Sequence, residues 1–174
     1  MDQPPHPTSV TVRAATAADG DAIIGLVLAL ADYERLPPPD PAARARLLSA
    51  AFSPQPRVNV LLAEADGQVA GYAFFFETYS TFLALPTLYL EDLFVLDSYR
   101  GRGLGGALMR ACAQEAVRRG CGRLDWTVLA WNAPAIGFYN HLGAQHLDDW
   151  YLYRLAGPAL ARLADGTEGV KRET

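Results

Sequence analysis

The stretch YRGRGLGGAL, Tyr99–Leu108, decides the fold of this 174-residue chain. It fits two phosphate-binding patterns at once: R-x-x-G-x-G starting at Arg100, and G-x-G-x-x-G starting at Gly101. The stretch leaves an apolar run and opens an amphipathic one, which predicts a loop between a strand and a helix. Glycines let backbone N–H groups approach an anion, and a helix N-terminus carries partial positive charge. We therefore expect a phosphate or pyrophosphate here, with Arg100 and Arg102 as additional donors.

The segments on either side of this loop predict one βαβ unit. A strand over 87–96, apolar except for Glu91 and Asp92, precedes the loop, and a helix over 104–120 and a strand over 122–130 follow it. A crossover of this kind makes its two strands parallel. Two β-rich runs over 57–79, joined at Asp66-Gly67, predict an antiparallel hairpin. The sequence therefore predicts an α/β protein whose central mixed β-sheet is flanked by helices.

The remaining segments complete one domain. The elements that we expect are a strand over 9–15, helices over 16–36, 41–52 and 132–143, a loop over 78–87, and one or two final strands over 144–155. Thr16, followed three residues later by Asp19, is a capping-box signal for the first helix. We expect the domain to span 10–160, between a Pro-rich N-terminal tail (1–9) and a C-terminal tail (161–174).

Composition argues against several functional classes. The formal net charge of −4 disfavours a nucleic-acid surface, which usually has a basic excess. The N-terminus resembles no signal peptide and no apolar run is long enough to span a membrane, so we expect a cytoplasmic protein. Cys112 and Cys121 have no Cys or His partner at metal-ligand spacing. We interpret them as reduced structural thiols and expect no metal site.

The glycine pattern by itself leaves alternatives open. A P-loop needs a Gly-Lys-Ser/Thr ending, which this stretch lacks. A dinucleotide-binding fingerprint should follow its strand at once in a doubly wound fold, whereas LDSYR intervenes and only one βαβ unit is present. A glycine-rich turn that binds nothing is the structural alternative, so the flanking sequence has to decide.

Four motifs, in order along the chain, carry a resemblance to a known family. They are LADYERL at Leu30–Leu36, YLEDLFV at Tyr89–Val95, YRGRGLG at Tyr99–Gly105 and WNAPAIGFYNHLGA at Trp131–Ala144. With them the chain resembles the Gcn5-related N-acetyltransferase (GNAT) superfamily, and within it the diamine (spermidine/spermine) acetyltransferase branch. The resemblance implies the acyl-CoA N-acyltransferase fold, acetyl-CoA as co-substrate, and a homodimer that pairs through the C-terminal strands.

The resemblance also implies roles for individual residues. Tyr139 matches the tyrosine that protonates the departing CoA thiolate, and Glu91 matches the carboxylate that deprotonates the amine, directly or through water. The implied acceptor contacts are Tyr33, Glu34, Glu91, Asp92 and Asp148. The implied acetyl-CoA contacts are Leu93, Phe94, Val95, Arg100, Gly101, Arg102, Gly103, Leu104, Gly105, Gly106, Asn132, Ala135 and Tyr139.

Elementary chemistry agrees with these roles. An amine attacks a carbonyl only when it is neutral, and an amine of pKa about 10 is mostly protonated at neutral pH, so a carboxylate or a water chain has to take the proton. A backbone N–H on a distorted strand would stabilise the charge that develops on the thioester carbonyl. Glu91 and Asp92 are adjacent in a strand and point to opposite faces, so one of them serves by a direct route, and we favour Glu91. The structural alternative is an ion pair with Arg123 or Arg100.

We therefore predict an enzyme that transfers acetyl from acetyl-CoA to a primary amine by direct attack in a ternary complex. The expected acceptor is a small polyamine or diamine-like molecule of the spermidine/spermine or thialysine type. The run HLDDW before Trp150 is shorter and less acidic than in the diamine enzymes, which weakens the expectation for Asp148. The alternatives are a protein N-terminal or aminoglycoside-type acetyltransferase, or a non-catalytic acyl-CoA- or dinucleotide-binding module, which would not need Tyr139 and Glu91 together.

Overall fold

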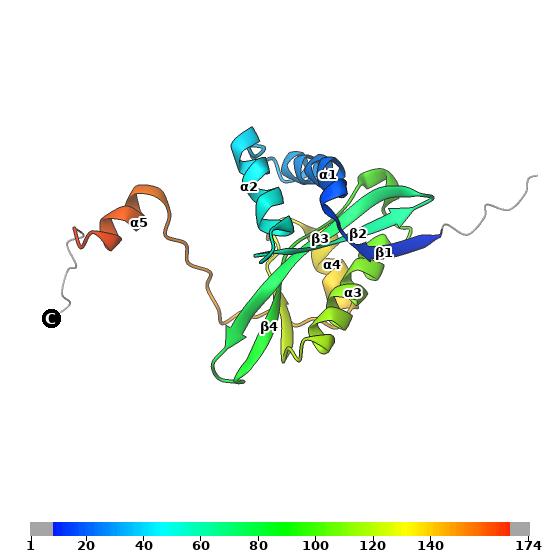
Figure 1. Ribbon diagram of the computed structural model, residues 1–174. Coiled ribbons are helices and arrows are strands. Elements are labelled where there is room, and N and C mark those ends of the chain that lie inside the picture. The colour runs from blue at the N-terminus through cyan, green and yellow to red at the C-terminus, as the bar shows by residue number, and fades with distance from the viewer. Residues whose placement is uncertain (1–8, 168–174) are drawn as a thin grey trace, which may run out of the picture. The chain divides into compact units, whose positions relative to one another are not determined.

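The computed structural model describes residues 9–167, which form two compact units divided between Thr127 and Val128 (Figure 1). The first unit holds a five-stranded sheet in the order β1-β2-β3-β4-β5. Its strands are β1 (Val10–Ala14), β2 (Asn59–Ala65), β3 (Gln68–Ser80), β4 (Leu85–Val95) and β5 (Arg123–Trp126). The pairs from β1 to β4 are antiparallel and β4 pairs with β5 in parallel. The predicted mixed sheet is therefore confirmed.

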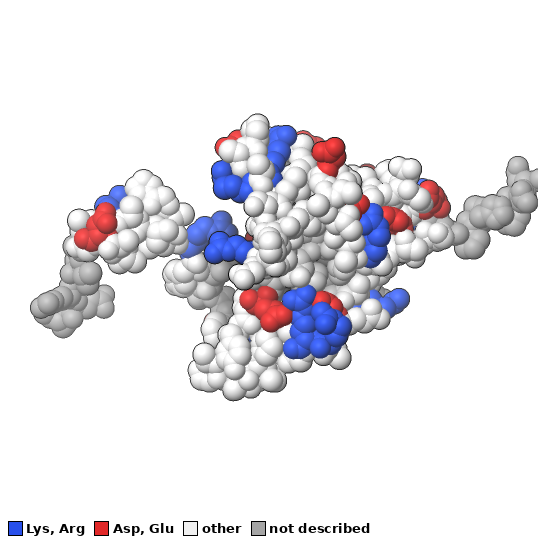
Figure 2. Space-filling view, viewed as in Figure 1, with Lys and Arg blue, Asp and Glu red and all other residues white. Residues whose placement is uncertain are grey.

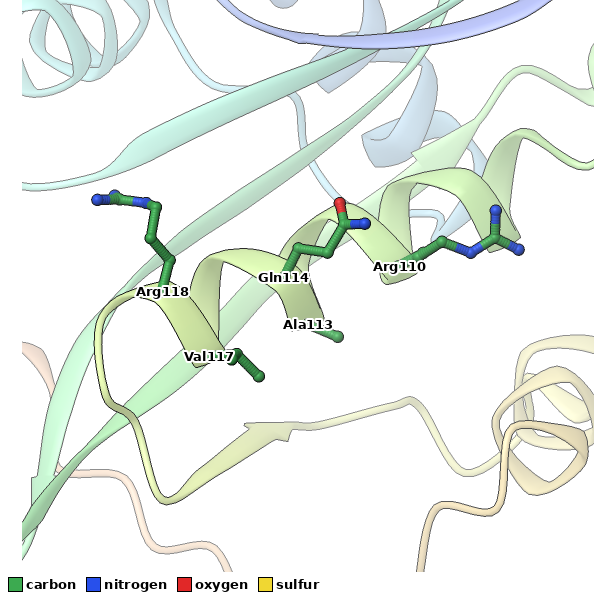
Figure 3. Close-up of a pocket in the computed structure, with 5 residues that line it drawn as sticks. All are labelled: Arg110, Ala113, Gln114, Val117 and Arg118. Carbon is green, nitrogen blue, oxygen red and sulfur yellow. The ribbon is translucent and has the colours of Figure 1, made fainter.

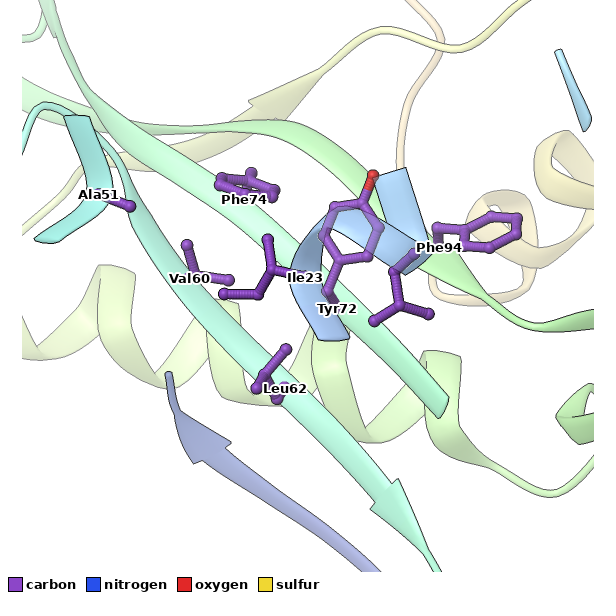
Figure 4. Close-up of a cluster of buried hydrophobic side chains, with 8 residues drawn as sticks. Ile23, Ala51, Val60, Leu62, Tyr72, Phe74 and Phe94 are labelled. Carbon is purple, nitrogen blue, oxygen red and sulfur yellow. The ribbon is translucent and has the colours of Figure 1, made fainter. Parts of the chain in front are cut away.

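One face of the sheet is covered by α1 (Gly20–Tyr33) and α2 (Pro41–Phe52). Ile23 of α1 packs in one buried cluster with side chains from β2, β3 and β4, among them Tyr72 and Phe94 (Figure 4). The other face is covered by α3 (Leu104–Arg118), which buries Leu104, Leu108, Met109, Cys112 and Ala116. Successive side chains of a strand point to opposite faces, which is why Gly71, next to Tyr72, lies against Leu108 of α3.

Local capping signals set the helix starts. Thr16 and Asp19 form the predicted capping box, but it caps a short 3-10 turn (Ala17–Asp19), and α1 begins only at Gly20. Asp40 accepts a hydrogen bond from the backbone N–H of Ala43 at 2.7 Å and caps α2, whose first residue is Pro41. These caps depend on residues three positions apart, so the sequence reveals them.

Three predicted segments need correction. The expected loop over 78–87 is mostly strand, because β3 runs to Ser80 and β4 starts at Leu85. The strand expected over 122–130 is only β5, which ends at Trp126. No strand forms over 144–155 in the described part of the chain, and α5 (Gly157–Ala164) crosses the expected start of the C-terminal tail. Strand propensity reflects packing on a half-buried pleated surface, and the side chains from Trp150 to Tyr153 are exposed instead.

The pairing of β4 with its two neighbours shapes the site. Along β3, Phe74 pairs with Asp92 and Phe75 with Leu90, so Glu91 is an extra residue in a β-bulge. On its other side β4 pairs with β5 only as far as Leu90, opposite Trp126. The two parallel strands therefore stop pairing at the residue that precedes the bulge.

Candidate active site

The segment of β4 that follows the bulge matches the predicted thioester-binding residues Leu93, Phe94 and Val95. Phe94 and Val95 are buried, and the Phe94 ring lies 6.3 Å from that of Tyr72, centroid to centroid. The hydrogen bonds of β4 with β3 hold this segment on one side, whereas the ladder with β5 has ended at Leu90. The expected distortion of the strand is present. Beyond Leu90, the edge of β4 that faces β5 has no strand partner among residues 9–167.

The glycine loop after β4 has the backbone geometry of an anion cradle. Gly101 and Gly103 have φ angles of 75° and 88°, in the left-handed region that favours glycine, and Gly103 is the N-cap of α3. The first helical hydrogen bond joins the Ala107 N–H to the Gly103 carbonyl at 2.9 Å, so the N–H groups of residues 104–106 precede the helical ladder. A Cβ built on Gly101, Gly103 or Gly106 would meet no described atom within 4 Å. This open, glycine-lined helix start fits the pyrophosphate of acetyl-CoA.

The remaining predicted contacts of this loop differ in character. The Leu104 side chain is 1% exposed and anchors the start of α3 in the core, so it leaves only its backbone for a ligand. Gly105 lies in the first turn of the same helix. The Arg102 guanidinium lies over the Tyr99 ring and 3.4 Å from the Asp66 carboxylate, on the exposed side of the loop.

Arg100 makes contacts within the protein to α1, β4 and the loop that follows β4. Its guanidinium carbon lies 4.5 Å from the centre of the Tyr33 ring, at the end of α1. Its Nε donates to the Val95 carbonyl at 3.2 Å, and its Nη1 lies 3.1 Å from the Asp97 carboxylate. Arg123 pairs with Asp125 at 2.9 Å. Among the described residues, therefore, both arginines suggested as ion-pair partners of the β4 carboxylates are paired with other acids.

Asp92, next to the bulge, lies within electrostatic reach of two other acidic side chains, Glu91 and Glu34. Burial, together with the negative charges of Glu91 and Glu34, raises the pKa of Asp92 to about 6. Burial also raises the pKa of Glu34, which follows α1 directly. Glu91 itself is exposed. Asp92, rather than Glu91, is thus the desolvated carboxylate at the bulge.

Tyr72 also acts on Asp92, and sequence reasoning missed it. Its hydroxyl is fully buried and has no hydrogen-bond partner of good geometry among the described residues, and it lowers the pKa of the Asp92 carboxyl in part. Burial and the charges of Asp92 and Glu34 raise the pKa of Tyr72, so the hydroxyl stays protonated. The only signal in the sequence was a hydroxyl within the apolar run GYAFFF.

The other predicted site residues belong to the second unit. Asn132 caps α4 (Ala133–His141) and accepts a hydrogen bond from the Ala135 N–H at 3.3 Å, which brings these two predicted contacts together. Tyr139, on the same helix, is half-buried, and burial raises its pKa to about 12. Asp148 is exposed and pairs with His146 two residues away.

Two surface hollows of the described chain are lined by none of the predicted site residues. A hollow of about 410 Å³ on the exposed side of α3 is lined by Arg110, Ala113, Gln114, Val117 and Arg118 (Figure 3). Basic and acidic side chains lie side by side on the face in Figure 2, and Glu115 pairs with Arg118 at 2.6 Å and with Arg119 at 2.7 Å. Within residues 9–167 no cluster of three or more metal-ligating side chains occurs, and no helix is long and apolar enough to cross a membrane.

Comparison with known proteins identifies the family. The model of the acetyltransferase (GNAT) family matches residues 26–144. The chain belongs to the acetyltransferase (GNAT) family. A thialysine N-ε-acetyltransferase from Bos taurus is 34% identical over 166 residues, covering 89% of this chain and 97% of the bovine protein. L-ornithine N5-acetyltransferase NATA1 from Arabidopsis thaliana is 46% identical over 95 residues, which is 55% of this chain and 42% of the plant protein.

Solved structures confirm the fold. An integron cassette protein of V. cholerae superposes with a TM-score of 0.78 at 30% identity, covering 90% of this chain and 98% of that one. An aminoglycoside N-acetyltransferase in complex with CoA superposes with a TM-score of 0.70 at 21% identity, covering 87% and 97%. The family, the fold and the place in the diamine acetyltransferase branch are as predicted. This GNAT protein is an acetyl-CoA-dependent N-acetyltransferase.

Proposed function

We propose that this acetyltransferase acetylates a primary amine of a small diamine- or polyamine-like acceptor, and that Asp92 takes the proton from that amine. The observation that carries the proposal is the desolvated Asp92 carboxylate at the bulge of β4, with Glu34 and Glu91 close enough to raise its pKa. Three acidic groups in one place favour a cationic acceptor. The names of the relatives above, with thialysine and L-ornithine as acceptors, also point to molecules that carry a side-chain amine.

The proposed reaction needs no covalent enzyme intermediate. Asp92 accepts a proton from the ammonium, and the neutral amine attacks the thioester carbonyl of acetyl-CoA. The carbonyl oxygen gains negative charge, for which a backbone N–H of residues 93–95 that points away from β3 is a donor. The C–S bond then breaks, the Tyr139 hydroxyl gives its proton to the departing thiolate, and the second proton lost by the amine nitrogen as the amide forms returns through water to the tyrosine oxygen. Because burial raises the pKa of Tyr139 to about 12, its hydroxyl is protonated at neutral pH and donates to the sulfur.

Glu91 takes a different part in this proposal from the one that the sequence favoured. Glu91 is exposed, whereas Asp92, with a pKa of about 6, is ionised at pH 7 and has a pKa near the working pH, as suits a general base. We propose that Glu91 and Glu34 attract and hold the acceptor ammonium groups, with Tyr33 beside Glu34. Asp148 is the least supported of the predicted acceptor contacts, since it is exposed and paired with His146.

A panel of amines tests the proposed function. CoA release is measured with acetyl-CoA and putrescine, spermidine, spermine, thialysine, L-ornithine, lysine, an aminoglycoside or a short peptide. We expect the highest kcat/KM for an acceptor with two amines. In Asp92→Asn this kcat/KM should fall by at least ~10²-fold. Asp32→Asn, at an exposed position of α1, is the matched control and should keep wild-type kcat/KM. A peptide or an aminoglycoside as the best acceptor would contradict the proposal.

We also propose that the chain forms a homodimer and works in the cytoplasm. The family resemblance motivates the dimer, and the extended run from Trp150 to Leu155 supports it, because its large side chains are exposed. Light scattering on the purified protein should give twice the mass of 18.8 kDa for one chain. The double change Tyr151→Asp and Tyr153→Asp should lower it to that of one chain. A single-chain mass for the wild type would contradict the dimer.

A further inference from the structure

We propose that Arg100 is a positioning residue that couples the acetyl-CoA loop to the acceptor end of α1. The inference rests on the proposed function, because it takes the glycine loop as the pyrophosphate site and Glu34 as an acceptor contact. It departs from the expectation that the Arg100 side chain donates to the phosphate. The contacts of this guanidinium point to α1 instead.

The first step of the argument is where the guanidinium lies. It sits over two aromatic rings, 4.5 Å from the centre of Tyr33 and 5.8 Å from that of Phe94. The two rings are themselves neighbours, with centroids 6.3 Å apart. Cations over aromatic faces within about 6 Å are attracted by the ring quadrupole. Arg100 therefore joins the last residue of α1 to the buried part of β4.

The second step is that Arg100 is fixed on the loop side as well. Its Nε donates to the carbonyl of Val95, which is the last residue of β4, and its guanidinium pairs with the Asp97 carboxylate. Arg100 directly precedes Gly101, whose positive φ begins the cradle. A ligand that fixes the backbone of this cradle therefore also fixes the backbone from which the guanidinium extends.

The third step concerns the end of α1, where Glu34 follows Tyr33. Glu34 is the next residue, and its charge acts on Asp92. The helix ends here through short-range hydrogen bonds, from the Glu34 N–H to Leu30 and from the Leu36 N–H to Ala31, both at 2.9 Å. A helix end held by such bonds frays easily unless side chains anchor it. The guanidinium anchors this end, and with it the direction of the Glu34 carboxylate.

Binding at the two sites is therefore linked through one side chain. Acetyl-CoA orders the loop, the loop holds Arg100, and Arg100 holds the α1 end in the orientation that receives the acceptor. Linkage is reciprocal, so an acceptor that orders the α1 end also tightens acetyl-CoA binding. Removing the guanidinium or the Tyr33 ring should break the same link.

Kinetics at saturating acetyl-CoA separate this role from phosphate binding. For Arg100→Gln we expect the KM for the amine to rise about 5- to 10-fold, as for the loss of one partly desolvated cation–π contact, while kcat changes less. Arg100→Lys keeps a cation and should recover part of the loss. Tyr33→Leu should reproduce the rise, and the double variant Arg100→Gln with Tyr33→Leu should be no worse than the more affected single variant.

Arg102→Gln is the matched control, because Arg102 lies in the same loop but contacts Tyr99 and Asp66 rather than α1. It should change acetyl-CoA binding without raising the amine KM at saturating acetyl-CoA. Thermal melting verifies that each variant is folded. An amine KM within twofold of wild type in Arg100→Gln, or additive effects in the double variant, would overturn the proposal.

Hydrogen exchange provides a readout that needs no acceptor. CoA should slow exchange of the Glu34 and Leu36 amides in the wild type and in Arg102→Gln, but not in Arg100→Gln at saturating CoA. Equal protection in Arg100→Gln would also overturn the coupling. If the wild type acetylates no small amine while CoA still protects these amides through Arg100, the proposed acceptor class is wrong and the coupling stands.

Discussion

Replacing Asp92 by Asn should make the protein more stable and the enzyme much slower. Burial and two neighbouring acids raise the pKa of this carboxyl from 3.8 to about 6 in the folded state. The folded state therefore binds this proton more tightly than the unfolded state does, so ionisation of Asp92 opposes folding. The loss of folding free energy from this ionisation is absent well below pH 3.8, grows between pH 3.8 and about 6, and is constant above that range.

The structure sets the size of this effect. At 1.36 kcal/mol for each tenfold change in acidity, a rise from 3.8 to about 6 opposes folding by about 3 kcal/mol at pH 8. At pH 4.5 the same linkage gives only about 1 kcal/mol. The asparagine amide is uncharged and avoids this opposition, although its own desolvation makes these figures upper values. Asp92→Asn should thus unfold at higher denaturant than the wild type, with the gap narrowing toward acid.

Urea unfolding at pH 8 and pH 4.5 measures the gap, with Asp32→Asn as the control for an exposed carboxylate, which should stay within about 0.5 kcal/mol of wild type. In the same preparations kcat/KM for the amine should fall by ~10²-fold or more in Asp92→Asn. A variant that is no more stable at pH 8 than the wild type, or whose gain does not shrink at pH 4.5, would refute the desolvation of Asp92. Gain of stability with full activity would refute its role as the base.

Further changes test other parts of the site and the core. The wild-type kcat/KM should rise with pH through an acidic limb centred near 6, because the base must be ionised; a flat profile from pH 5 to 7 would contradict this assignment. Gly103→Val should weaken acetyl-CoA binding at least ~10-fold by calorimetry, because φ is 88° and the side chain would enter the cradle; Gly120→Val, also at positive φ, should leave binding unchanged. Tyr139→Phe should lower kcat by ~10²-fold with acetyl-CoA binding kept, and unchanged turnover would remove its role. Gly71→Ala should lower the unfolding free energy by roughly 1–3 kcal/mol, because its Cβ would lie 2.8 Å from the Phe94 carbonyl oxygen.

The sequence by itself determined the features that depend on neighbouring residues. Glycines at 101 and 103 adopt the positive φ angles that few other residues tolerate, so the cradle could be read from their spacing. The caps at Asp40 and Asn132 are likewise local, since each side chain accepts from an N–H three residues away. Periodicity is also a local property, and it located the strands of the sheet and the helices that flank it. The strand expected near the C-terminus failed because a strand also needs a partner, which no local pattern supplies.

The tertiary structure alone decided which side chains meet around the bulge. Alternation placed Glu91 and Asp92 on opposite faces but could not tell which face would be buried, because that depends on the register with β3 and on the bulge between Phe74 and Phe75. Tyr72 reaches Asp92 only through that register. The sequence motivated Arg100 as a phosphate donor, but the contact of its guanidinium with the Tyr33 ring depends on how α1 packs against the sheet. Desolvation and cation–π contact act between residues far apart in the chain, so only the folded structure reveals them.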